Sequence, residues 1–96
     1  MNEFVTKERL SKYFSVTRLA LDEARRSPEN VEINDSTRKH FIDTVERYLR
    51  DAQHFESTGD LVNAFAALNY AHGWLDAGVK LGIFDVNNSE LFAGVD

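Results

Sequence analysis

Residues 59–84 read GDLVNAFAALNYAHGWLDAGVKLGIF, and this stretch decides the fold of the 96-residue chain. Asp60 stands before an apolar run, where its carboxylate can accept hydrogen bonds from the free N–H groups of a first helical turn. Gly82 stands two residues after Lys80, and glycine readily adopts the left-handed conformation in which many helices end. The stretch therefore predicts a helix over about residues 60–81.

The apolar residues of this helix form a wide arc when successive residues are placed about 100° apart. Small residues occupy the middle of the arc: Ala64, Ala67, Ala71 and Gly78. Larger apolar residues flank them, with Leu61, Phe65, Leu68, Leu75 and Val79 on one side and Tyr70, Trp74, Ala77 and Leu81 on the other. An arc this wide predicts a helix that contacts two neighbours, and the small residues let both approach closely.

Two further helices are predicted from the same periodicity. Thr6 can cap a helix that runs to about Arg26, where Ser27-Pro28 ends it because the residue before proline avoids helical geometry. A second helix covers about residues 36–57, capped by Asp35 or Ser36. The connection to the third helix is short, so these two helices must be antiparallel neighbours.

The predicted fold is all-α, a single domain over residues 1–96 that forms a three-helix up-and-down antiparallel bundle. The C-terminal tail carries Phe84, Leu91 and Phe92, which are too apolar for a free tail, so we expect it to dock on the bundle. Residues 28–35 form the longest connection, and we expect Val31 and Ile33 within it to cover one end of the bundle.

Composition excludes several classes of function. The net charge is −5, which argues against a general nucleic-acid or anionic-membrane binder, since these rely on a basic surface. Cysteine is absent, so neither a disulfide nor a thiolate site is possible. The sequence shows no signal-peptide pattern and no apolar run of the ~20 residues that a membrane span requires. We expect a cytoplasmic protein without a membrane segment.

One segment resembles a known family. The run from Gly59 to Gly78, with its GWLDAG segment at residues 73–78, follows Asp51-Ala52 and is similar to the archaeal domain of unknown function usually numbered 357. The resemblance covers about the last two-thirds of the chain. It implies a small archaeal helical bundle, and it implies no activity, because the family has none assigned.

The first candidate site is a polar stripe on the third helix. It contains Asn69, His72, Gly73 and Asp76, and continues to Lys80. Glycine inside a helix costs about 1 kcal/mol relative to alanine, so Gly73 should serve packing or access. The stripe predicts a notch for a small polar ligand or a partner; alternatively, Asp76 and Lys80 form an ordinary ion pair and His72 closes the edge of the core.

The second candidate is catalytic. Arg47 and His54 lie two turns apart on the wet face of the second helix, a spacing that resembles the Arg–His motif of HEPN helical ribonucleases. The alternative is that both residues simply lie on a solvent-exposed helix face without a catalytic role. The acidic net charge favours this alternative, because it disfavours an RNA substrate.

We expect no bound metal and no cofactor. Asp51 with His54, and His72 with Asp76, are plausible ligand pairs, but the antiparallel register separates them by about 15 Å. A better-registered set adds His40 and Asp43 to His72 and Asp76, yet Asp43 projects away from the core.

The sequence thus predicts a non-catalytic protein-interaction module that binds a protein partner or a second copy of itself. An enzyme that acts on RNA or nucleotides through Arg47 and His54 is the alternative.

Overall fold

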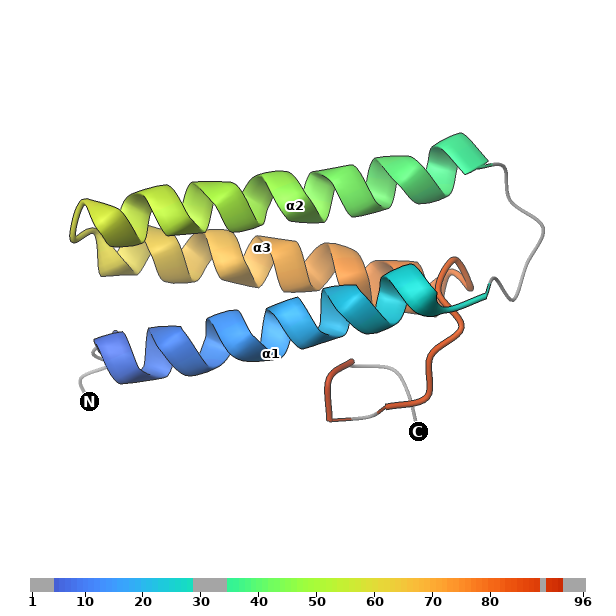
Figure 1. Ribbon diagram of the computed structural model, residues 1–96, viewed down its shortest axis with the longest axis horizontal. Helices are drawn as coiled ribbons and strands as arrows, with labels where there is room; N and C mark the ends of the chain where they lie inside the picture. Colours follow the sequence, from blue (N-terminus) through green and yellow to red (C-terminus); the bar gives the residue numbers. More distant parts are fainter. Residues whose placement is uncertain (1–4, 29–34, 89, 93–96) are drawn as a thin grey trace.

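Three helices account for most of the computed structural model, which describes residues 5–28, 35–88 and 90–92. They are α1 (Lys7–Arg26), α2 (Asp35–Ser57) and α3 (Leu61–Lys80). Figure 1 shows them side by side, alternating in direction, with α3 between α2 and α1. The predicted up-and-down all-α bundle is confirmed, and each predicted helix end agrees to within one residue.

The helix ends follow from local chemistry. The Thr6 side chain accepts a hydrogen bond from the Arg9 amide at 3.1 Å, and Asp60 Oδ1 accepts one from the Asn63 amide at 3.2 Å. Gly59 and Gly82 both have a φ of 82°, the left-handed conformation that side chains disfavour. The predicted cap of α2 at Asp35 or Ser36 is wrong, because the helix already begins at Asp35 and both residues lie in its first turn.

The inner side of α3 forms the centre of the core. Ala64, Ala67, Ala71 and Gly78 are buried there, together with Leu68 and Leu75. Leu10 and Phe14 of α1 and Val45 and Leu49 of α2 pack into the same cluster. The small residues of α3 therefore lie where the neighbouring helices approach it, as the apolar arc predicts.

One side of the predicted arc is wrong. Tyr70, Ala77 and Leu81 are exposed, with 63% of Tyr70 and 59% of Leu81 open to solvent. On this side of α3, the buried surface ends at the row of Ala67, Ala71 and Gly78, which lies next to α2. Residues one step further around α3 consequently lie outside the bundle, even though they are apolar.

The C-terminal tail docks as predicted. Ile83, Phe84 and Phe92 are buried, and Leu91 is half-buried. The Asp85 amide donates to the Pro28 carbonyl at 2.7 Å, and Asn88 Nδ2 lies 3.3 Å from Glu23 Oε1. Figure 1 shows this segment passing along the α1 side of the bundle. The expected positions of Val31 and Ile33 fall outside the described residues.

Candidate functional site

Among the residues that the structure describes, the side of α3 that points away from the bundle has an unusual composition. We call it the outer face and define it by the exposed residues Val62, Asn63, Ala66, Asn69, Tyr70, Gly73, Ala77, Lys80 and Leu81. Val62 is 68% exposed, more than any other large apolar residue that the structure describes. Within this set only Lys80 carries a charge. The solvent side of an amphipathic helix is normally charged or polar, so this face departs from the usual pattern.

The outer face is hollowed beside α2. An open cavity of about 590 Å³ is lined by Phe41, Ala66, Asn69, Tyr70, Gly73, Trp74 and Ala77. Three of these residues are aromatic: Tyr70 stacks on Tyr48 with ring centroids 5.4 Å apart, and Phe41 meets Trp74 edge-on at 5.0 Å. Apart from its chain neighbours and the backbone of its own helix, a Cβ atom added to Gly73 would have no atom within 4 Å. Gly73 therefore widens the hollow without serving a contact inside the chain.

His72 points away from this hollow, toward α1 and the tail. Its Nε2 lies 2.6 Å from the Leu91 carbonyl oxygen, and its Nδ1 lies 3.2 Å from the hydroxyl of the fully buried Thr17. A carbonyl only accepts, so His72 Nε2–H donates to Leu91. His72 thus joins α1, α3 and the tail.

The structure divides the predicted polar stripe into two parts. Asn69 and Gly73 line the hollow, whereas His72 lies with only 16% of its side chain exposed between α1 and the tail. Asp76 Oδ1 lies 3.8 Å from His72 Nε2, on the same side of α3. A ligand in the hollow would therefore meet Asn69 and Gly73 without the His72 ring. The binding role of the four residues stays a prediction.

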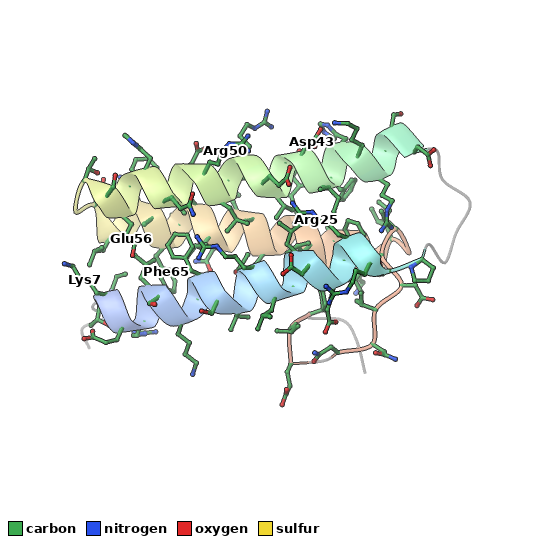
Figure 2. The ribbon with its side chains drawn as sticks, viewed as in Figure 1. Lys7, Arg25, Asp43, Arg50, Glu56 and Phe65 are labelled. Carbon is green, nitrogen blue, oxygen red and sulfur yellow. The ribbon has the colours of Figure 1, made fainter. Side chains whose placement is uncertain are left out.

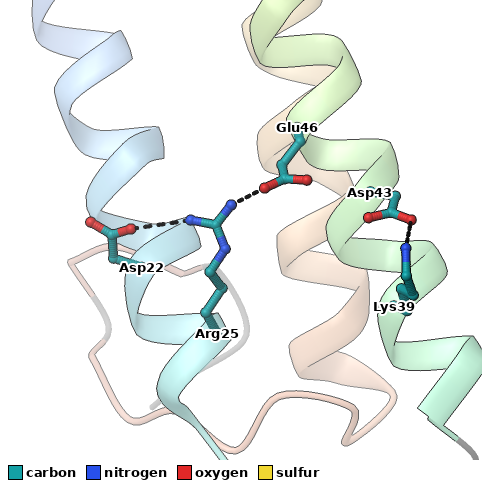
Figure 3. A network of polar contacts seen from close by, with 5 residues as sticks. All are labelled: Asp22, Arg25, Lys39, Asp43 and Glu46. Atoms are coloured by element: carbon teal, nitrogen blue, oxygen red, sulfur yellow. Dashed lines mark hydrogen bonds and ion pairs between the residues drawn. The ribbon is translucent and has the colours of Figure 1, made fainter.

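Arg47 and His54 are both exposed on α2. A groove between α1 and α2 is lined by Arg18, Arg25 and Arg50 together with Asp22 and Glu46, and neither Arg47 nor His54 lines it. Arg25 bridges Asp22, at 3.4 Å, and Glu46, so acidic groups offset the positive charge of that groove (Figure 3). The nuclease role of Arg47 and His54 stays a prediction.

A second ion pair lies further along α2. Lys39 Nζ is 2.6 Å from Asp43 Oδ2, and this hydrogen bond, with the charge of Asp43, raises the pKa of Lys39 above its ordinary value of 10.5. Figure 2 shows Asp43 on the side of α2 turned away from α1, with Arg50 further along the same helix. Across the described ranges, no three His, Asp or Glu side chains gather in a group that could hold a metal ion.

Comparison with known protein families gives a match over most of the chain. The family model described as "Protein of unknown function (DUF357)" matches residues 12–84. The chain belongs to this family. The DUF357 match begins within α1, spans α2 and α3 and ends at Phe84, so the predicted resemblance is confirmed, while the archaeal origin stays a prediction. Neither the curated proteins nor the solved structures contain a match. In the part of the chain that is described, no helix has the length and apolar character to cross a membrane.

One structural residue of this DUF357 chain, Arg38, escaped sequence reasoning. Arg38 donates hydrogen bonds to the carbonyls of Ala24, Ser27 and Ile83 at 2.8–2.9 Å, and its guanidinium lies 5.2 Å from the centre of the Phe84 ring. It thereby fastens the end of α1 and the start of the tail to α2. An arginine at the start of a helix gives no such signal in sequence, because its partners are backbone carbonyls distant along the chain.

Proposed function

We propose that this DUF357 protein is a small, non-catalytic interaction module that binds a protein partner through the outer face of α3. The observation that carries the proposal is the exposure of Val62, Tyr70 and Leu81 along one helix face that has a single charge. Full burial of a side chain such as Val62 or Leu81 is favourable by about 1.5–3 kcal/mol, and more than half of each remains exposed in the single chain.

The shape of the face supports a macromolecular partner over a small polar ligand. The hollow is open, and its border is made of aromatic rings, with Asn69 as its polar side chain. Binding sites for small molecules usually enclose the ligand and place several polar groups around it. Aromatic side chains around an apolar depression are typical of the centre of a protein interface.

A site-specific crosslink tests this proposal. A photoreactive benzoyl-phenylalanine replaces Asn69, which lines the hollow, and in a matched variant it replaces Ser15, which is exposed on α1. After irradiation in the native cells, we expect a protein adduct from position 69 and none from position 15. Absence of an adduct at position 69, or equal adducts at both positions, would contradict the proposal.

A further inference from the structure

The outer face of α3 has the same spacing when it is followed in either direction from a point between Tyr70 and Gly73. Toward the N-terminus come Tyr70, Ala66 and Val62, four residues apart; toward the C-terminus come Gly73, Ala77 and Leu81, also four residues apart. We infer that the partner of this face is a second copy of the chain, with the two α3 helices antiparallel about a twofold axis between Tyr70 and Gly73. The inference rests on the proposed function and names its partner.

At the centre of this pairing, a large side chain lies opposite a glycine, which has no side chain. In an antiparallel twofold pair, Tyr70 of one copy faces Gly73 of the other, and the contact occurs twice. The Tyr70 ring stacks on Tyr48 and leaves 63% of the residue exposed, and Gly73 lies beside it in the hollow. The Tyr70 ring of one copy would enter the hollow of the other. A glycine that no contact inside the chain requires is explained by this approach.

The residues on either side of the centre also suit the antiparallel pairing of the two α3 helices. Ala66 of one copy faces Ala77 of the other, and both are exposed and small enough for the helix axes to come within about 8 Å. Val62 and Leu81 then lie at the two ends of the contact. Each apolar residue of the face therefore meets an apolar residue, and Lys80 stands at the ends, where its ammonium group can reach solvent.

In the same antiparallel register, charged residues of α2 in one copy lie level with residues of opposite charge on α2 of the other copy. Tyr48 stacks on Tyr70 and Phe41 contacts Trp74, so the axis between Tyr70 and Gly73 passes α2 near Val45. The exposed residues Asp43 and Arg47 lie on opposite sides of that point, one turn apart. Arg47 of one copy then lies level with Asp43 of the other. Asp51 likewise lies level with His40 of the other copy.

The area of the face suits a dimer. A 20-residue helix is about 30 Å long, and two adjacent helices are about 20 Å across, which gives roughly 600 Å² for each copy. Standard protein interfaces bury about 600–1,000 Å² on each side. The outer face with the adjoining edge of α2 is thus large enough for a specific contact.

Sedimentation of the purified chain tests self-association. We expect a species of twice 11.0 kDa, and a Gly73→Leu variant whose dissociation constant is at least about tenfold higher, because leucine fills the hollow that receives Tyr70. A Leu side chain at this position meets no atom of its own chain at Cβ, so circular dichroism should show the helices intact. Ser15→Leu on α1 is the matched control and should leave the dimer unchanged. A chain that stays at 11.0 kDa up to about 1 mM would overturn the inference.

Disulfide trapping tests the antiparallel register, and the natural chain contains no cysteine to interfere. In the proposed pair, Ala66→Cys faces position 77 of the other copy, so a mixture of the Ala66→Cys and Ala77→Cys variants should form a mixed disulfide on mild oxidation. Each variant alone should remain largely reduced, because its own equivalents lie about 16 Å apart. A dominant disulfide in the Ala66→Cys sample alone would overturn the antiparallel arrangement.

The photocrosslink at position 69 separates this inference from the proposed function. An adduct with twice the mass of the chain supports both. An adduct with a different protein, from a chain that sediments as a monomer, overturns the self-pairing and leaves the interaction function in place. No adduct at position 69 overturns both.

Discussion

Gly73 and Gly78 occupy the same helix five residues apart and have opposite surroundings. A Cβ atom on Gly78 would come within 2.6 Å of Cδ2 of the buried Phe84 ring, so the tail requires a glycine there. A Cβ atom on Gly73 would meet nothing within 4 Å. The fold of the single chain accounts for the first glycine and gives no reason for the second. The difference directs attention to contacts outside the chain.

The solvent-exposed sides of the three helices also differ in composition. The exposed residues of α1 and α2 are mainly charged and include Lys12, Arg18, Asp22, Arg47 and Arg50. The outer face of α3 carries mainly apolar residues, two asparagines and a single charged residue, Lys80. Charged surfaces keep a small protein soluble and separate, whereas an apolar face of this kind marks a site of association.

Removal of the Phe84 ring should have the largest effect on stability. Phe84 is fully buried, lies over Gly78 and is contacted by Arg38 and Phe41. Phe84→Ala should lower the free energy of unfolding by about 3–5 kcal/mol, because it leaves a cavity at the centre of the docked tail. Urea unfolding followed by circular dichroism measures the change. A loss below about 1 kcal/mol would show that the tail contributes little to the fold.

Alanine substitutions at the two glycines sharpen the comparison directly. Gly78→Ala should cost at least about 1 kcal/mol, since displacement of the Phe84 ring outweighs the helix propensity that alanine gains. Gly73→Ala should instead stabilise the dilute chain by up to about 1 kcal/mol. Thermal melts of both variants at low concentration measure the difference. Equal destabilisation by both changes would mean that Gly73 also serves the interior.

Much of this comparison was accessible from sequence. The caps at Thr6 and Asp60, the break at Pro28 and the 3.6-residue period fix the helices, because these signals are local. The sequence did not show where the buried part of the apolar arc ends. Tyr70 and Trp74 are both large aromatic residues on the same side of the arc, yet α2 covers Trp74 more fully than Tyr70. Only the position of α2 determines which apolar residue is left outside.

The candidate site was predicted in part for the same reason. Gly73 stood out because glycine is costly inside a helix, and the structure places it in the hollow. His72 was grouped with it by sequence spacing, but its hydrogen-bond partners are Thr17 and the Leu91 carbonyl. Contacts made across 55 and 19 residues leave no local pattern that a sequence reading can detect.

Loss of the His72 contacts should have an intermediate effect. His72→Leu removes both hydrogen bonds and leaves the buried Thr17 hydroxyl and the Leu91 carbonyl without this partner, which should cost about 1–3 kcal/mol. The matched control is His54→Leu on the exposed side of α2, which should change stability by no more than about 0.5 kcal/mol. Chemical denaturation distinguishes the two. If both variants unfold alike, His72 does not hold the tail.

The surface ion pairs should have the smallest effect. Arg25 and Glu46 join α1 to α2 with 42% and 34% of their side chains exposed, so solvent screens the attraction. Glu46→Gln should therefore lower stability by less than about 1 kcal/mol, and added salt should reduce the difference further. The midpoint of urea unfolding at low and high ionic strength measures it. A larger, salt-independent loss would place this pair among the main contacts of the bundle.

The fluorescence of Trp74 on dilution tests most directly whether a second copy covers the outer face. The chain has one tryptophan, and it lies at the hollow beside Gly73. We predict that its emission shifts to longer wavelength as the protein is diluted, with a midpoint that matches dissociation of the dimer in sedimentation, because departure of the partner exposes the indole ring. An emission maximum that stays constant from the most concentrated to the most dilute sample would contradict the account.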